Sequence, residues 1–285
     1  MKMRAAISFA IVFVLSTLAG AEPTVKPIGS GLYAYISDND SSANSTFLIG
    51  DAGILVVDTG LNATEGMKLL HAIRQVSPLP VKYIVNTHYH PDHQGGDATV
   101  GPTAVIITTE FTRERTEALK KTPQFESFRP ADLTFQQQVT LHLDPYSVRI
   151  YFPGKGHTAG DALVYFPQQR AISMGDLFLN RSSPAMDNGS VANWIQALNH
   201  VLDLPLDNVV PGHFELGTKS DLQRFRDYLN DLYTQVRTLK QKNETLDQVR
   251  HDVHMDKYSD FRQYPKFEAT FSDNAAVIYQ ELQDR

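Results

Sequence analysis

Three histidines and an aspartate fall within six residues of the chain, directly after a short apolar run at 81–85 that predicts a buried strand. They are His88, His90, Asp92 and His93. Imidazole nitrogens and carboxylate oxygens are preferred zinc ligands. On extended backbone the i, i+2 spacing of His88 and His90 points both rings the same way. Because the whole chain has only 10 histidines, the segment predicts a metal site, not a chance surface cluster.

Three further pieces have the same character, since each presents one ligand-type side chain after a predicted strand. They are Gly156-His157-Thr158, Gly175-Asp176 and Gly212-His213. A lone histidine or aspartate after a strand is a weak signal. Together with the first cluster, however, these residues complete two sets of metal ligands.

Hydrophobic patterning predicts strands and helices that alternate along the chain. One helix, over 62–76, places Met67, Leu70 and Ile73 on one stripe. The strands that we expect are 31–36, 45–49, 53–57, 81–85, 104–108, 139–143, 147–152, 162–166, 170–174 and 208–211, and the helices are 62–76, 110–121, 192–204, 220–242, 248–255 and 274–282. This order favours an α/β chain with two β-rich layers, covered by helices on both outer sides.

The combined motifs resemble the metallo-β-lactamase superfamily of hydrolases. The resemblance rests on His-x-His-x-Asp-His, then Gly-His-Thr, Gly-Asp and Gly-His in that order, and on Val56-Val57-Asp58-Thr59-Gly60 upstream. It extends from about residue 31 to 213. It implies an αββα sandwich of two mixed β-sheets flanked by helices, with a metal site at one edge between the sheets.

The resemblance also implies a role for each candidate residue. One zinc would bind His88, His90 and His157, a second would bind Asp92, His93 and His213, and Asp176 would bridge them; Asp58 would steady the loop that carries the histidines. A hydroxide between the two metals would attack an acyl carbon, and Asp92 would orient it and accept its proton. Iron or manganese could replace zinc.

The substrate is less constrained. The chain has no cysteine, so it differs from β-lactamases with a cysteine ligand, and its ligand set also resembles glyoxalase-II-type thioesterases and lactonases. We expect a small-molecule substrate, with a β-lactam or related cyclic amide first and a lactone or thioester second. Two other classes remain: a mononuclear iron dioxygenase acting on persulfides, and a binding module without catalysis. Tyr89, Asn180 and Arg181 are the expected substrate contacts.

The first 21 residues have the features of a secretory signal peptide: Lys2 and Arg4, an apolar run, and Ala19-Gly20-Ala21 before the cleavage point. We therefore expect cleavage after Ala21 and a periplasmic or secreted protein. Residues 22–285 would form a single domain with a C-terminal helical extension and no membrane span. The formal net charge of −6 argues against nucleic acid as a partner, and the sequence carries no signal for an oligomeric state.

Overall fold

The computed structural model describes residues 22–186, 188–265 and 268–283. The predicted signal peptide, residues 1–21, lies outside the described residues. Within the described ranges, no helix combines the length and the apolar composition that crossing a bilayer requires.

The first sheet has seven strands whose order in space follows their order in the chain. Strands β1 to β4 pair antiparallel, whereas β4 to β7 pair parallel. The strands are β1 (Thr24–Gly29), β2 (Leu32–Ile36), β3 (Ser45–Ile49), β4 (Ile54–Val57), β5 (Val81–Val85), β6 (Val105–Thr109) and β7 (Leu133–Phe135). Because β4, β5 and β6 are parallel, their carboxyl ends meet at one edge of the sheet.

The second sheet has five strands in the order β12-β11-β10-β9-β8. Strands β8 to β11 pair antiparallel, and β12 pairs parallel with β11. The strands are β8 (Gln138–Leu143), β9 (Tyr146–Tyr151), β10 (Leu163–Phe166), β11 (Ala171–Ser173) and β12 (Asn208–Val210).

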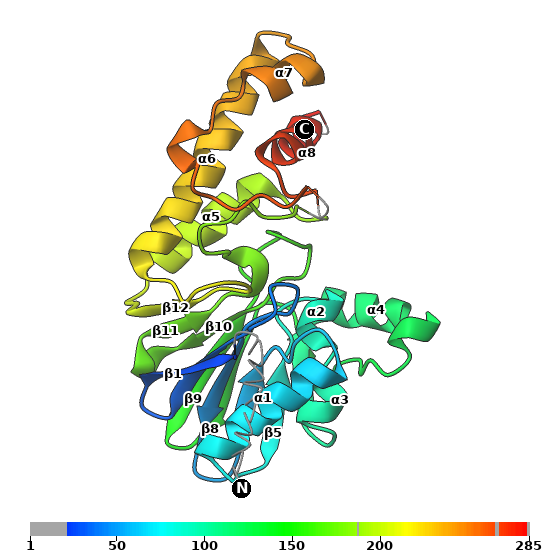
Figure 1. Ribbon diagram of the computed structural model, residues 1–285, viewed down its shortest axis with the longest axis vertical. Helices are drawn as coiled ribbons and strands as arrows, with labels where there is room; N and C mark the ends of the chain where they lie inside the picture. The colour runs from blue at the N-terminus through cyan, green and yellow to red at the C-terminus, as the bar shows by residue number, and fades with distance from the viewer. Residues whose placement is uncertain (1–21, 187, 266–267, 284–285) are drawn as a thin grey trace, which may run out of the picture.

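Three apolar clusters hold the layers together. The middle cluster lies between the two sheets and contains Val57, Val85 and Val164. Leu69 and Ile73 of α1 (Ala63–Val76) pack on the outer face of the first sheet. Helices α5 (Val191–Leu202) and α6 (Lys219–Gln241) cover the outer face of the second. The expected αββα sandwich is confirmed (Figure 1).

The remaining helices fall into two groups. Helices α2 (Pro91–Gln94), α3 (Asp97–Val100) and α4 (Glu110–Leu119) follow strands of the first sheet. Helices α7 (Leu246–Asp252) and α8 (Phe271–Glu281) pack against α6 and against each other, and in Figure 1 they stand with α6 above the sheets. We refer to residues 245–283 as the C-terminal extension.

The structure corrects the predicted phase of α1. Met67 is 57% exposed and Leu70 is half-buried, whereas Ile73 is buried, so only part of the expected stripe faces the core. The buried face contains Gly66, Leu69 and Ile73. Gly66 allows the close approach, because a Cβ there would lie 2.9 Å from the Cα of Gly96 in the loop after α2.

Candidate metal centre

The loop that carries His88, His90, Asp92 and His93 begins at the carboxyl end of β5. Asp58, directly after the neighbouring strand β4, holds this loop in place. One oxygen of this carboxylate accepts from the backbone N–H of Thr87 at 2.8 Å. The other accepts from the Thr87 hydroxyl at 2.8 Å and lies 2.8 Å from Nδ1 of His93. Asp58 is buried and has a φ of 55°, a left-handed conformation that is uncommon outside glycine. The structure thus places Asp58 where it orients both the loop and one imidazole.

Two glycines explain why a Gly-Asp and a Gly-His pair converge on this loop. Gly175 has a φ of 50°, and a Cβ on it would lie 2.4 Å from Oγ1 of Thr87. A Cβ on Gly212 would lie 1.9 Å from Oδ1 of Asp176. Larger residues at either position would push Asp176 away from the histidines.

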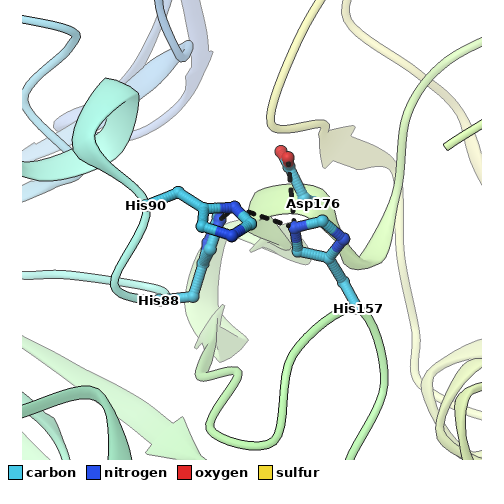
Figure 2. Close-up of side chains that lie close together, drawn as sticks. All are labelled: His88, His90, His157 and Asp176. Atoms are coloured by element: carbon cyan, nitrogen blue, oxygen red, sulfur yellow. Dashed lines mark hydrogen bonds and ion pairs between the residues drawn. The ribbon is translucent and has the colours of Figure 1, made fainter. Parts of the chain in front are cut away.

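The first ligand group comprises His88, His90, His157 and Asp176 (Figure 2). Nδ1 of His90 lies 3.0 Å from Nε2 of His88 and 3.1 Å from Nε2 of His157. Oδ2 of Asp176 lies 3.6 Å from Nε2 of His157. Three ring nitrogens and one carboxylate oxygen therefore face a common point.

The hydrogen bond at Nδ1 of His157 determines whether its Nε2 can act as a metal ligand. Its Nδ1 lies 3.0 Å from the carbonyl oxygen of Ala185, and since a carbonyl only accepts, Nδ1 carries the proton. Burial lowers the pKa of His157 to about 4, so the ring is neutral at pH 7. Its Nε2 therefore presents a lone pair to the site, as a metal ligand must. Burial, with neighbouring histidines, also lowers the pKa of His88 well below its usual value.

The second ligand group comprises Asp92, His93 and His213. Nε2 of His213 lies 3.1 Å from Oδ2 of Asp92, and Nε2 of His93 lies 3.6 Å from the same oxygen. Oδ1 of Asp176 lies 3.2 Å from Nε2 of His93 and 3.6 Å from Nε2 of His213. Asp176 thus turns one oxygen to each group, which is the geometry of a bridging carboxylate.

Charge in the second group is balanced within the protein. Burial alone would lower the pKa of His93, but the carboxylates of Asp176, Asp58 and Asp92 outweigh it and raise the pKa well above its usual value. His93 and His213 in turn hold the pKa of Asp176 well below its usual value, against the effect of burial. The carboxylates are therefore ionised and available as ligands.

The residues fit two divalent cations. Nε2 of His93, Oδ1 of Asp176 and Nδ1 of His213 are buried without a hydrogen-bond partner among the described residues. Buried polar atoms are almost always satisfied, and a cation in the second group would satisfy the first two, which both face that group. Imidazole and carboxylate ligands suit zinc, iron and manganese.

A cavity of about 550 Å³ opens onto both groups. This volume is typical of small-molecule sites. Its wall contains the ligands His90, Asp92, His157, Asp176 and His213, and the further residues Asp40, Ser41, Leu61, Pro91, Leu179, Ser182, Ser183, Ala185, Phe214, Tyr264 and Ala269.

The three expected substrate contacts do not line this cavity. Tyr89 is buried, with its ring against His90 and its hydroxyl accepting from Asn188 at 3.1 Å. Asn180 points the other way, since its Nδ2 donates to the carbonyl of Glu215 at 3.1 Å. Arg181 is exposed outside the wall. The segment after Asp176 does reach the cavity, but through other residues.

Sequence reasoning missed the wall residues Phe214 and Tyr264. Phe214 directly follows His213 and has a φ of 70°, a strained conformation that is found at functional sites. Its ring stacks on Tyr264, with centroids 5.7 Å apart and planes at 4°. Phe214 could have been found from its neighbour in the sequence, but nothing in the sequence places Tyr264, 50 residues later, beside it.

Comparison with known families matches residues 38–213 to the model described as the metallo-beta-lactamase superfamily. The match contains all seven candidate ligands and ends before α6, so the C-terminal extension lies beyond it.

Curated proteins with different names are similar in sequence to this chain. The chain is 30% identical to the alpha subunit of 2,4-dinitroanisole O-demethylase from Nocardioides sp. (strain JS1661) over 58% of its length, and spans half of that subunit. It is 28% identical to metallo-beta-lactamase type 2 from Bacillus cereus, over 68% of this chain and 76% of that enzyme.

Solved structures agree on the fold. A metallo-beta-lactamase from Pontibacter korlensis aligns with a TM-score of 0.63 and 26% identity, over 73% of this chain and 99% of that one. The sec-alkylsulfatase Pisa1 from Pseudomonas sp. aligns with a TM-score of 0.74 over 90% of this chain and 50% of that one, and its 16% identity shows the fold alone.

Proposed function

Because the chain belongs to the metallo-beta-lactamase superfamily, we propose that it is an exported, two-zinc hydrolase that cleaves an acyl bond of a small molecule. The observation that carries the proposal is the pair of ligand groups that share Asp176 at the floor of one cavity. Two neighbouring ligand groups that share a carboxylate and open onto one cavity are typical of catalytic two-metal centres.

Bound metals would supply Lewis-acid activation of a water and of the acyl oxygen. The protein's own residues then position the reaction. Asp58 fixes His93, and the carbonyl of Ala185 fixes His157, so both rings keep Nε2 directed toward the centre. Asp92, whose side chain is 26% exposed to the cavity, is the carboxylate placed to accept a proton from the attacking water.

Among substrates, the names of the relatives from Bacillus cereus and Elizabethkingia meningoseptica, both metallo-beta-lactamase type 2, support a β-lactam or related cyclic amide. A lactone or thioester is the second candidate, favoured by the apolar residues of the cavity wall. The mononuclear iron dioxygenase is less well supported, because Asp92, His93 and His213 lie together as a second complete ligand group.

Export rests on the predicted signal peptide, residues 1–21. Expression of the full chain in a Gram-negative host, followed by fractionation and mass spectrometry, tests it. We expect a periplasmic protein that begins at Glu22; a cytoplasmic protein that keeps residues 1–21 would contradict export.

The hydrolase proposal is tested with protein from Glu22 onward, loaded with zinc and given a chromogenic cephalosporin, a lactone and a thioester. We expect two zinc ions per chain and turnover of at least one substrate, abolished by a chelator and restored by zinc. His142→Ala, an exposed histidine of β8 outside both groups, is the control and should keep metal and activity. A two-zinc protein that hydrolyses none of the three, or a single bound iron, would refute the proposal.

A further inference from the structure

Apart from the ligand histidines, the charged side chains among the described residues of the cavity wall are acidic. Among the described residues of the wall, Asp40 is the charged residue besides the five ligands, and none of these described wall residues is a lysine or arginine. Asp40 lies in the loop between β2 and β3, and its charge acts on Tyr264, whose pKa is raised chiefly by burial and further by Asp40. A carboxylate thus stands beside the aromatic part of the wall.

Two arginines beside the site are held by other groups. The guanidinium of Arg262 lies over the ring of Phe214, 4.6 Å from its centroid, and its Nη2 is 2.7 Å from the Glu215 carboxylate. The guanidinium of Arg115 lies 5.1 Å from the ring centroid of Tyr89. Both therefore support aromatic rings from outside the cavity and do not present a cation to a substrate.

The apolar part of the wall comes partly from the C-terminal extension. Tyr264 and Ala269 belong to the extension and line the cavity together with Leu179 and Phe214. The stacked Phe214–Tyr264 pair continues from the ligand His213, whose ring centroid lies 6.0 Å from that of Phe214. A flat apolar group of a substrate bound at the metals would contact this aromatic pair.

The extension is also anchored close to the cavity. The backbone N–H of Ser183 donates to the carbonyl of Arg262 at 2.9 Å. Nδ2 of Asn274 on α8 donates to Oγ of Ser183 and to the hydroxyl of Tyr228, each at 2.8 Å. Because these bonds hold a wall residue directly, the extension is a fixed part of the cavity.

From this wall we infer that the cavity selects uncharged acyl substrates with a flat apolar group, which packs against Phe214 and Tyr264, and that Asp40 disfavours substrates bearing a carboxylate. The inference rests on the proposed hydrolase function. Within each candidate class, the β-lactams and related cyclic amides as well as the lactones and thioesters, it favours members without a carboxylate. Reaction with an ester adds water across the acyl–oxygen bond and releases an acid and an alcohol.

Two chromogenic esters with one leaving group isolate the charge. 4-Nitrophenyl heptanoate and the 4-nitrophenyl monoester of adipic acid have acyl chains of similar length, but only the second ends in a carboxylate. We expect the zinc-loaded enzyme to favour the heptanoate at least 10-fold in kcat/KM. Asp40→Asn should raise kcat/KM for the adipate several-fold more than kcat/KM for the heptanoate, so the ratio between the two esters should fall. Asp51→Asn, the same change in the exposed turn between β3 and β4, should change neither.

Tyr264→Leu tests the aromatic wall. It should raise KM for both esters several-fold and change kcat less, since Tyr264 is part of the cavity wall and is not one of the ligands. A second readout does not depend on catalysis. Calorimetry on the zinc-free protein should show tighter binding of the heptanoic anilide than of the adipic monoanilide. Asp40→Asn should reduce this difference in affinity.

Equal rates on both esters, or a ratio unmoved by Asp40→Asn, would overturn the inference and leave the hydrolase function intact. A two-zinc protein that cleaves neither ester, and no lactam, lactone or thioester, would overturn the proposed function itself.

Discussion

Asp58→Asn is the substitution that most directly tests how the protein prepares its second ligand group. The carboxylate accepts hydrogen bonds from the backbone and hydroxyl of Thr87 and from Nδ1 of His93. Asparagine has nearly the same shape and tolerates the left-handed φ of 55°. It can accept at one oxygen only, so its amide NH₂ faces the Thr87 hydroxyl and the His93 ring.

The consequence for His93 follows from its tautomers. To pair with an NH₂ group, Nδ1 of His93 must become an acceptor, and the ring proton moves to Nε2. That nitrogen then cannot bind a cation. Loss of such an orienting partner costs about 10- to 100-fold in metal affinity, which corresponds to about 1.4–2.7 kcal/mol. The loss of hydrogen bonds to a charged group should also lower the unfolding free energy by about 1.5–3 kcal/mol.

A zinc titration against a chromogenic chelator at pH 7.5 measures the two binding steps. We expect Asp58→Asn to weaken one step 10- to 100-fold and to change the other less. Asp97→Asn is the matched control, since Asp97 is equally buried but bonds only Thr59 and Asn86, and no ligand. Wild-type affinity at both steps in Asp58→Asn would refute the assigned role of Asp58.

Further perturbations test other parts of the molecule. His90→Ala removes one ring of the first group, so bound zinc should fall from two ions towards one and turnover should vanish; full metal content by elemental analysis with normal rates would contradict this. Asn274→Ala leaves the buried hydroxyls of Ser183 and Tyr228 without their shared donor, and should cost about 1–3 kcal/mol in urea unfolding; an unchanged midpoint would argue against the anchor. Burial raises the pKa of Asp97 to about 7 from 3.8, so the folded state holds this proton more tightly than the unfolded state. The stability that the proton contributes is full below pH 4 and is lost as the pH rises to about 7, at up to about 1.4 kcal/mol per pH unit. The stability of Asp97→Asn relative to the wild type should therefore increase between pH 5 and 7.5. A difference in unfolding free energy that stays constant over this range would refute the pKa shift.

Sequence patterning predicted the elements that are long or strongly apolar. The strands at 45–49 and 81–85 have the predicted bounds, and α1 begins after Asn62, whose side chain caps it. Patterning missed β1 and β7, which are edge strands of the first sheet. Edge strands bury one side at most, so β1 shows a mostly exposed pattern and β7 has only three residues.

The candidate site likewise has one part that the sequence predicted and another part that it did not. All seven predicted ligands lie in the two groups, because each belongs to a local motif after a strand: four to the segment 88–93, and one each to Gly156-His157, Gly175-Asp176 and Gly212-His213. Two of the expected substrate contacts, Asn180 and Arg181, lie outside the cavity wall. They were chosen from their chemistry, whereas the direction of a side chain depends on the fold, as the hydrogen bond from Asn180 to the carbonyl of Glu215 illustrates.

The sequence by itself therefore determined the chemistry of the centre: which residues can bind a metal, in what order, and after which strands. Only the tertiary structure decided how Asp176 divides its oxygens between the groups, and that Tyr264 completes a wall beside Phe214. The physical reason is the separation along the chain of the residues that form each feature. Ligand motifs are encoded within a few neighbouring residues, whereas a cavity wall is assembled from segments far apart in the chain, which only packing brings together.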